Sequence, residues 1–246
     1  MAYGVFADYY DSLTENVNYT RKADYICEIF KKLSHTPVSA LDLACGTGSL
    51  TLELYKKGID IFGIDASSEM LTQAQSKALE SGAEIMFVRQ RMQQLELWGE
   101  IDTCVCTLDS LSHLQGAGEL EKAIERVSYY MESGGVFVFD VNTPYKHKNI
   151  LGSNTFVYDT DDVYLVWQNT YRERDCSVKI ELDFFVPNGG VYSRERESFR
   201  EFAYPTETIR EILTKHYFKV EAMYDDFSFD PPNEVSQRIT FAARKI

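Results

Sequence analysis

A short segment that begins at Asp42 combines an acidic side chain, two glycines and the start of a helix. It reads DLACGTG and overlaps the end of the apolar run 38–43. Glycines at 46 and 48 let the backbone approach a ligand closely, and the helix after them offers free N–H groups and a positive dipole end. The carboxylate of Asp42 would repel a pyrophosphate, whereas it would attract a ligand with an ammonium or sulfonium group.

A second acid, Asp65, stands at the end of the next apolar run, 59–64. In open α/β sheets an acid at this place can accept hydrogen bonds from ribose hydroxyls. The two acids and the glycine bend therefore indicate a site for a positively charged ligand that contains a ribose.

A dinucleotide is the alternative ligand for such a bend. Its fingerprint is G-x-G-x-x-G, and counted from Gly46 the third glycine position is occupied by Thr51. Asp65 suits either ligand, because both contain a ribose. A nicotinamide-dependent oxidoreductase is therefore an alternative function with a less complete motif.

The elements that would position this bend alternate along the first 150 residues. Apolar runs typical of strands occupy residues 38–43, 59–64, 85–88, 101–107 and 136–141. Patterns typical of helices occupy residues 21–33, 50–57, 67–81 and 119–131. Strands that alternate with helices at this spacing predict a parallel sheet with helices on both faces. We expect the bend at the carboxyl end of the first strand.

The pattern changes after residue 149. Four stretches alternate apolar and polar residues, namely 156–158, 163–172, 177–186 and 191–203. Asn188-Gly189-Gly190 is a hairpin turn signal between the last two stretches. We predict an antiparallel β insertion of three or four strands over residues 150–204.

The remaining residues, 205–246, return to the helix and strand patterns that are typical of the first 150 residues. They contain a helical pattern at 206–216 and two apolar runs at 218–224 and 237–245. The predicted organisation is a cofactor-binding core with an N-terminal lid segment over residues 1–149, the insertion, and a return to the core for the last helix and strands six and seven.

Two motifs carry a family resemblance. DLACGTGSL at 42–50, followed by GIDAS at 63–67, resembles the first two motifs of class I S-adenosylmethionine-dependent methyltransferases. The usual family form has glycine where Ala44 stands here. The resemblance covers residues 38–142 well and the closing strands more loosely. It implies an α/β, Rossmann-like, mostly parallel sheet of seven strands with the seventh antiparallel, and S-adenosylmethionine as cofactor.

The resemblance also implies which residues hold the cofactor. The bend would face the methionine part, Asp42 would hold the amino group directly or through water, and Asp65 would hold the ribose hydroxyls. The implied cofactor-binding residues are Tyr19, Asp42, Ala44, Cys45, Gly46, Thr47, Gly48, Asp65, Ala66, Met70, Arg91, Met92, Leu108 and Asp109.

Arg91 departs from the family pattern, since relatives often have aspartate there. An arginine cannot accept a hydrogen bond from the adenine amino group, so backbone groups at 91–92 would have to substitute. Met70 and Met92 would lie near the adenine, and core packing is their alternative role.

His113 follows the fourth predicted strand. The chain has some similarity to amino-sugar N-methyltransferases of this superfamily, which have a histidine at the corresponding place and a Tyr-Asp pair matched here by Tyr10-Asp11. A neutral histidine can take a proton from an incoming amine. His113 and Tyr10 are therefore the candidate catalytic residues, and a helix-capping or surface position is the alternative for His113.

Three further residues are candidates for substrate contact. Asn142 ends the fifth predicted strand, where open α/β sheets bind their ligands. Trp167 and Tyr171 share one face of a predicted strand in the insertion. That face would cover a substrate pocket or an oligomer partner, such as the second copy of a homodimer.

Composition narrows the class of partner. The chain has 25 basic and 38 acidic residues, a net charge of −13, which disfavours nucleic-acid binding because that affinity comes largely from Lys and Arg. The first thirteen residues lack the basic and apolar regions of a signal peptide, and no apolar run reaches transmembrane length. Five cysteines without a CxxC pair and only four histidines predict buried thiols and no metal site.

We therefore expect a cytoplasmic protein without membrane or nucleic-acid partners that transfers a methyl group from S-adenosylmethionine to an N or O nucleophile of a small molecule. Methyl transfer from a sulfonium needs alignment of the two reacting atoms and exclusion of water. The main alternative is a non-catalytic protein that binds S-adenosylmethionine or S-adenosylhomocysteine.

Overall fold

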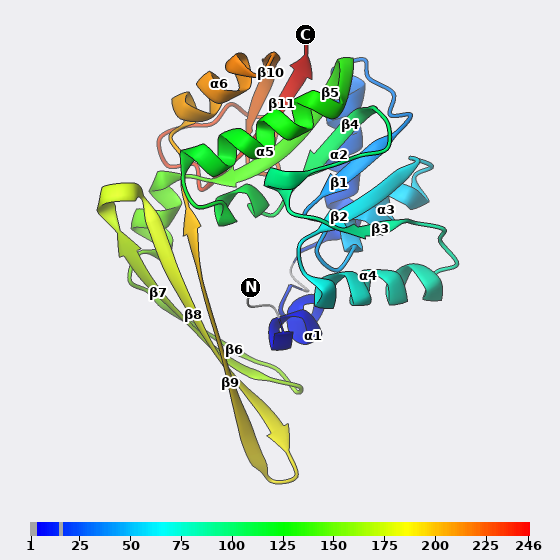
Figure 1. Ribbon diagram of the computed structural model, residues 1–246. Coiled ribbons are helices and arrows are strands. Elements are labelled where there is room, and N and C mark those ends of the chain that lie inside the picture. Colours follow the sequence, from blue (N-terminus) through cyan, green and yellow to red (C-terminus); the bar gives the residue numbers. More distant parts are fainter. Residues whose placement is uncertain (1–3, 15–16) are drawn as a thin grey trace.

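A seven-stranded sheet forms the centre of the larger part of the molecule in the computed structural model, which describes residues 4–14 and 17–246 (Figure 1). Its strands are β1 (Ala40–Leu43), β2 (Ile61–Asp65), β3 (Phe87–Arg89), β4 (Ile101–Cys106), β5 (Met131–Asn142), β10 (Phe218–Asp225) and β11 (Arg238–Lys245). They lie in the order β10-β11-β5-β4-β1-β2-β3. Neighbours from β5 to β3 are parallel, and β11 runs antiparallel to β5 and β10. The predicted Rossmann-like sheet with an antiparallel seventh strand is confirmed.

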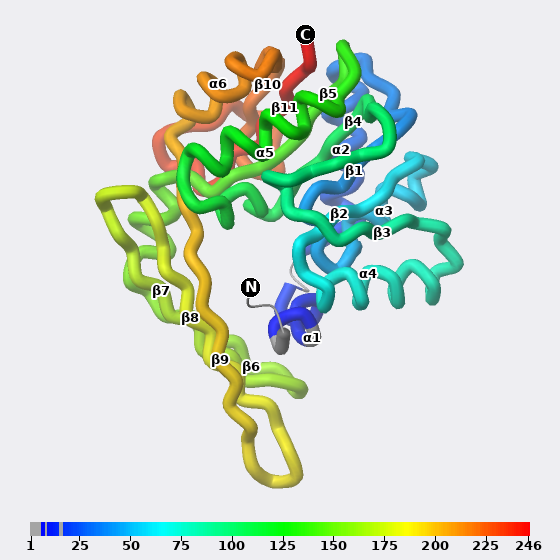
Figure 2. The backbone as a smooth tube through the Cα atoms, viewed as in Figure 1, coloured from blue at the N-terminus to red at the C-terminus, as the bar shows by residue number. Residues whose placement is uncertain are grey.

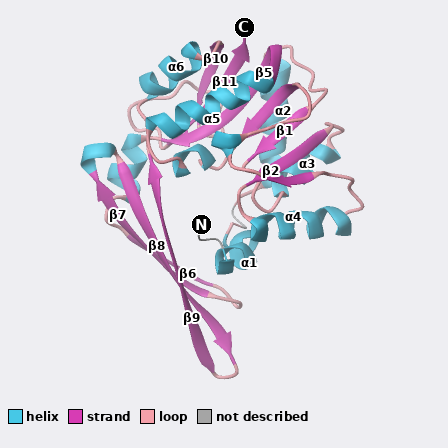
Figure 3. Cartoon of the chain, viewed as in Figure 1, coloured by secondary structure: helices cyan, strands magenta, loops and turns pink. Residues whose placement is uncertain are grey.

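Helices cover both faces of this sheet (Figure 3). They are α2 (Tyr19–Lys32), α3 (Ser49–Lys56), α4 (Ser68–Glu80), α5 (Ala117–Tyr130) and α6 (Thr206–Lys215). Side chains of β5 alternate between two apolar clusters, because successive residues of a strand point to opposite faces. Phe137 and Phe139 pack with α5 and α6, whereas Val136 and Val138 pack with α2 and α3. Burial of each such side chain contributes about 1.5–3 kcal/mol.

The insertion is a four-stranded antiparallel sheet in the order β6-β7-β8-β9. The strands are β6 (Thr155–Asp159), β7 (Tyr164–Arg172), β8 (Ser177–Asn188) and β9 (Val191–Phe202). The β8–β9 hairpin reaches well beyond the core (Figure 2). An antiparallel β insertion after the fifth strand was predicted, and the structure confirms it.

The N-terminal segment, which was predicted to be a lid, contains a helix, α1 (Gly4–Leu13), that the sequence pattern did not predict. One side of α1 packs on the apolar cluster of the insertion sheet through Phe6, Tyr9 and Leu13. The ring of Phe184 on β8 lies 6.0 Å from that of Phe6 and 6.5 Å from that of Tyr9. The helix thus lies between the insertion and the core, close to α4 (Figure 1).

Short helical turns complete the connections and also went unpredicted. They are η1 (Met92–Gln94), η2 (Ser110–His113), η3 (Lys146–Leu151) and η4 (Glu173–Asp175). Strand β5 also begins earlier than the predicted residue 136. It pairs with β4 first at Met131 and again at Val136, with an irregularity between them that takes up the intervening residues.

A buried charge network ties the carboxyl end of this sheet together. Asp140 on β5 accepts a hydrogen bond from Lys22 Nζ of α2 at 3.1 Å and one from Arg238 Nη1 of β11 at 3.3 Å. It also accepts from the backbone N–H groups of Leu108 at 3.0 Å and Asp109 at 2.6 Å. Burial alone would raise the pKa of Asp140, but the two cations outweigh it and hold this pKa at about 2.

Replacing Lys22 should expose how much the fold depends on this network. Lys22→Met leaves the buried Asp140 carboxylate without its ammonium partner, and we expect the free energy of unfolding to fall by about 3 kcal/mol. Lys31→Met is the control on the same helix, because the exposed Lys31–Glu28 pair contributes less than about 1 kcal/mol. Guanidinium chloride unfolding at pH 7 measures both changes.

The contribution of Asp140 to the free energy of unfolding depends on pH in a direction that its pKa defines. Since the pKa of Asp140 is lower in the folded than in the unfolded chain, its contribution is complete at neutral pH and is lost as the pH falls from about 4 to about 2. The difference between wild type and Lys22→Met should shrink over that window. Equal losses for Lys22→Met and Lys31→Met at pH 7 would contradict the assignment.

Candidate cofactor and acceptor site

The bend after β1 is held open by its backbone conformation. Ala44, Gly46 and Gly48 have positive φ values of 61°, 56° and 72°. A Cβ at Gly48 would lie 2.9 Å from the Cβ of Ala74, so glycine there permits the close packing of α3 and α4. A Cβ at Gly46 would meet open space, so Gly46 serves the left-handed turn and leaves room beside it.

The two acids of the motif have different partners. Asp42 is 2% exposed and accepts a hydrogen bond from Thr51 Oγ1 at 2.6 Å. Burial raises the pKa of Asp42 to about 7, and the nearby Asp65 carboxylate adds to the rise. A cation that reaches Asp42 would therefore stabilise its ionised form.

Asp65 connects the bend after β1 to the turn after β2 by hydrogen bonds to both. Its Oδ2 accepts from the backbone N–H of Gly46 at 2.9 Å, and its Oδ1 accepts from that of Ser67 at 2.8 Å. Burial raises the pKa of Asp65, while these backbone donors lower it in part. Each carboxylate oxygen has a second lone pair, so Asp65 can still accept hydrogen bonds from a diol.

Three backbone amides of the bend already donate hydrogen bonds within the protein. Cys45 N donates to Ile64 O at 3.0 Å, Gly46 N donates to Asp65, and Gly48 N donates to Cys45 O at 3.0 Å. A dinucleotide site needs such N–H groups for its pyrophosphate. The bend therefore suits a cationic ligand better than a pyrophosphate.

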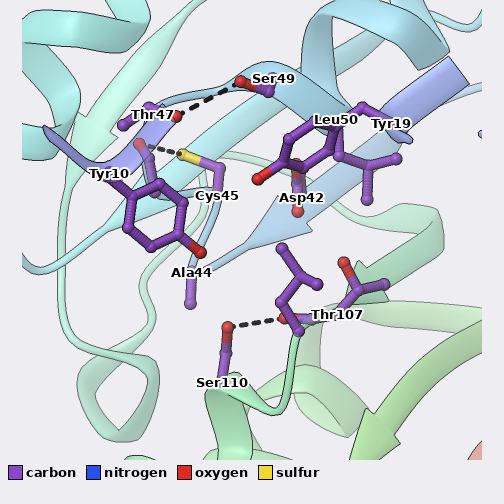
Figure 4. A pocket seen from close by; sticks show the side chains of 12 residues that line it. Tyr10, Tyr19, Asp42, Ala44, Cys45, Thr47, Ser49, Leu50, Thr107 and Ser110 are labelled. Atoms are coloured by element: carbon purple, nitrogen blue, oxygen red, sulfur yellow. Dashed lines mark hydrogen bonds between the residues drawn. The ribbon is translucent and has the colours of Figure 1, made fainter. Parts of the chain in front are cut away.

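A cavity that opens to solvent lies against this bend (Figure 4). Its lining residues are Tyr10, Tyr19, Asp42, Ala44, Cys45, Gly46, Thr47, Ser49, Leu50, Thr107, Leu108 and Ser110. In the view of Figure 4, the rings of Tyr10 and Tyr19 lie on either side of Ala44 and Cys45. A buried acid and two aromatic rings around one space fit the ammonium and sulfonium groups of S-adenosylmethionine.

The predicted cofactor residues divide into two groups by position. Tyr19, Asp42, Leu108 and the bend from Ala44 to Thr47 line the cavity, as does the candidate catalytic residue Tyr10. The other predicted residues, Gly48, Asp65, Ala66, Met70, Arg91, Met92 and Asp109, are not among the lining residues.

The structure gives several of this second group other surroundings. Met70 is buried in the core, and Met92 packs against the larger apolar cluster. Arg91 is exposed and precedes the η1 turn, and the backbone oxygen of Ala66 accepts from Arg89 Nε at 3.2 Å. Contact of these residues with adenine stays a prediction.

Helix α1 is clasped to the bend on its second side. Asp11 accepts from Thr47 Oγ1 at 2.8 Å and pairs with Lys77 Nζ of α4 at 2.6 Å. Lys77 also donates to Ser49 Oγ at 2.6 Å. The clasp, defined as Asp11, Thr47, Ser49 and Lys77, holds α1 and its Tyr10 over the cavity.

The loop after β4 leads from the cavity to a second polar region. Leu108 and Asp109 have positive φ values of 55° and 52°, and Asp140 accepts from both of their N–H groups. Asp109 pairs with Arg238 Nη2 at 2.6 Å and accepts from Asn142 Nδ2 at 2.8 Å. Asn142 is buried and accepts from Lys146 Nζ at 2.8 Å, so its side chain links charged groups.

His113 ends η2 on the side of the insertion. Its side chain is 32% exposed, and its ring centroid lies 5.2 Å from that of Phe199 on β9. Burial lowers the pKa of His113, and the nearby Asp109 opposes this shift. The imidazole is therefore neutral at pH 7 and able to take a proton.

Trp167 and Tyr171 lie elsewhere, within the apolar cluster of the insertion sheet. Trp167 Nε1 donates to Asn169 Oδ1 at 2.7 Å, which satisfies its polar atom. Neither residue lines the cavity, and the same cluster receives Phe6 of α1. Their contact with substrate stays a prediction.

Sequence reasoning missed several polar residues of this region, namely Lys22, Asp140, His147, Glu201 and Arg238. Lys22 stands four residues before Ile26 on the apolar side of its helix, and Asp140 interrupts the apolar run 136–141. Both positions carried a signal, because a charged residue at a core position needs a partner.

The described part of the chain contains neither a candidate metal site nor a candidate membrane-spanning helix. Among residues 4–14 and 17–246, no group of three or more His, Cys, Asp or Glu side chains could hold a metal ion. Within the same residues, no helix has the length and apolar character needed to cross a bilayer.

The sheet order and the acid-flanked open bend are those of the Rossmann-like class, in which ligands bind at the carboxyl edge of the sheet. A sequence profile described as a methyltransferase domain matches residues 40–135. A putative methyltransferase of Bacillus subtilis, YqeM, is 31% identical over 246 residues, covering 100% of this chain and 98% of that protein. The chain therefore belongs to the S-adenosylmethionine-dependent methyltransferases.

Two further comparisons add structural and chemical context. The crystal structure of an S-adenosylmethionine-dependent methyltransferase from Clostridium acetobutylicum is 33% identical with a TM-score of 0.89, covering 99% of this chain and 98% of that one. The dTDP-3-amino-3,6-dideoxy-alpha-D-glucopyranose N,N-dimethyltransferase of Streptomyces fradiae is 27% identical over 139 residues, 56% of this chain and 53% of that protein.

Breaking the clasp should loosen α1 alone. Lys77→Met removes the ammonium that joins Asp11 and Ser49, a loss of about 1 kcal/mol for a networked surface pair. We expect the amide protons of α1 to exchange about fivefold faster, with global unfolding nearly unchanged. Lys56→Met, which removes the exposed Lys56–Glu53 pair on α3, is the control. Unaltered exchange in α1 would show that the clasp does not hold the helix.

Proposed function

We propose that this methyltransferase acts on the amine nitrogen of a small molecule. The observation that carries the proposal is the position of the partly exposed imidazole of His113, on the η2 turn whose first residue, Ser110, lines the cavity. Burial lowers the pKa of His113, which favours the neutral ring that can take a proton. An imidazole can take the proton that an ammonium group must lose before its nitrogen attacks. The N-methylation named for the Streptomyces fradiae relative supports the same nucleophile.

The cofactor residues receive their roles from charge and position. Asp65 accepts from the ribose hydroxyls, Asp42 pairs with the amino group, and the bend from Ala44 to Thr47 faces the methionine part. The rings of Tyr10 and Tyr19 stabilise positive charge near the sulfonium. When bound, S-adenosylmethionine supplies an electrophilic methyl group.

The chain itself aligns the acceptor, excludes water and takes a proton. The nitrogen lone pair forms the new N–C bond as the S–C bond breaks and its electron pair stays on sulfur. His113 takes the proton that the nitrogen must lose, and the clasped helix α1 holds Tyr10 against the cavity, which limits the access of water to it.

The remaining finer expectations form part of the proposal. The net charge of −13 supports a small molecule over a nucleic acid as acceptor. The free thiols support a reducing, cytoplasmic location. The insertion, over residues 150–204, acts as a cover through its contact with α1, and the exposed Val191 and Tyr192 at the tip of its hairpin are available to a second copy in a homodimer.

An acceptor panel tests the nucleophile. Purified protein with S-adenosylmethionine is incubated with nucleotide-linked and free amino sugars, small amines, and matched compounds in which a hydroxyl replaces the amine. We expect S-adenosylhomocysteine and a methylated product only with amines, and about a hundredfold lower kcat in His113→Asn with unchanged affinity for S-adenosylmethionine. His216→Asn, at the residue that follows helix α6, is the control. Turnover of the hydroxyl compounds alone refutes an amine as the methyl acceptor. Full activity of His113→Asn refutes His113 as the residue that takes the proton.

Asp65→Asn tests the cofactor site. Loss of charge-assisted hydrogen bonds to two ribose hydroxyls should raise the Kd for S-adenosylmethionine about a hundredfold. Asp60→Asn is the matched control, since Asp60 is exposed just before the same strand. Calorimetric titration measures both, and thermal melting verifies folding. An unchanged Kd in Asp65→Asn would show that Asp65 does not bind the ribose. Binding of NADH in place of S-adenosylmethionine would favour the oxidoreductase alternative.

A further inference from the structure

A buried carboxyl group from the insertion lies between two histidines of the core. Glu201 stands near the end of β9, and its side chain is 7% exposed. Its Oε1 lies 3.8 Å from His113 Nε2, and its Oε2 lies 3.8 Å from His147 Nε2 on η3. Asn142 Nδ2 is 3.5 Å from the same Oε2. The last strand of the insertion thus brings an acid to the region beside the cavity.

His147 has an orphaned nitrogen aimed at this acid. Its side chain is 0% exposed, and its Nδ1 lies 2.9 Å from the backbone oxygen of Cys176. Because a carbonyl oxygen only accepts, Nδ1 must carry the hydrogen, and Nε2 of the neutral ring then has a lone pair. In the described part of the chain this Nε2 has no hydrogen-bond partner. Two acceptors that face each other in a buried site repel unless a proton lies on one of them.

The surrounding charges place that proton on the acid. Three charged residues face Glu201: Asp109 from the loop after β4, Lys146 from η3 and Arg238 from β11. The side chains of His113, His147 and Asn142 also lie beside it. Burial raises the pKa of Glu201 to about 8, Asp109 adds to the rise, and Lys146 and Arg238 offset part of it. Burial lowers the pKa of both histidines. At pH 7 the cluster therefore holds a protonated carboxyl between two neutral rings.

We propose that Glu201 is a positioning residue for methyl transfer, which orients His113 through Oε1 and shares one proton with His147 through Oε2. When His113 takes a proton from the acceptor amine, an N–H bond of the ammonium breaks and one forms on the imidazole. The Glu201 O–H proton then moves to Nε2 of His147, so that the Glu201 carboxylate lies between two imidazolium rings, those of His113 and His147. The inference rests on the proposed function, since it assumes that His113 receives the proton of the amine.

The first test needs neither cofactor nor acceptor. The ring signals of the four histidines are followed by NMR from pH 5 to 10 in the full-length protein. In wild type we expect the signals of His113 and His147 to report one ionisation near pH 8, to which His35 and His216 do not respond. Glu201→Gln should abolish this response, whereas Glu195→Gln, an exposed residue on the same strand, should preserve it. Persistence of the response in Glu201→Gln overturns the proposal.

His147→Asn tests the same proposal independently of whether Glu201→Gln folds. In His147→Asn the amide nitrogen can still donate to the Cys176 oxygen, but the lone pair opposite Glu201 is lost. The neutral carboxyl form then loses its acceptor, so the ionisation seen at His113 should move down by about one pH unit. An unchanged midpoint overturns the shared proton.

Kinetics separate this inference from the proposed function. With an amine found by the acceptor panel, Glu201→Gln should lower kcat at least tenfold, leave the KM for S-adenosylmethionine unchanged, and remove the limb of the pH profile near 8. An identical rate and pH profile in Glu201→Gln overturns the positioning role and leaves the proposed function intact. Failure of wild type to methylate any amine overturns the proposed function, whatever the histidine spectra show.

Discussion

The carboxylate of Asp140 is the point to which the functional edge of the sheet is anchored. It accepts from Lys22 on α2, from Arg238 on β11 and from two backbone N–H groups after β4. Left-handed backbone at Leu108 and Asp109 costs roughly 1–2 kcal/mol each, which bonds to a charged acceptor can offset. The loop that lines the cavity therefore has its shape because a buried charge on β5 needs donors.

The bend after β1 shows how local hydrogen bonding selects the ligand class. Asp65 takes up the Gly46 amide and keeps spare lone pairs, so the site offers acceptors where a pyrophosphate would need donors. Asp42 adds a buried acid whose pKa, raised to about 7 by burial, favours a cation as partner. Glycine is needed at these two positions for different reasons. Gly48 permits the close packing of α3 and α4, whereas Gly46 leaves room beside the cavity.

The insertion contributes to the site through contacts that reach in two directions. Its apolar face receives Phe6 and Tyr9 of α1, whose other side is clasped to the bend through Asp11. Its last strand carries Glu201 to His113 and His147. Helix α1, which brings Tyr10 to the cavity, and the polar groups beside the cavity therefore both contact the insertion sheet, so movement of β9 would alter both.

The sequence by itself determined the sheet, the insertion and the acid-flanked bend, because strand periodicity, turn residues and the DLACGTG motif are local properties of the chain. It did not predict α1, whose helix depends on packing against β8 and α4. Only the tertiary structure decided the pairs Lys22–Asp140, Asp109–Arg238 and Asn142–Glu201, which are 118, 129 and 59 residues apart. Such pairs follow from strand order, since β11 enters beside β5 and β9 returns past η2, and no local pattern records which strands become neighbours.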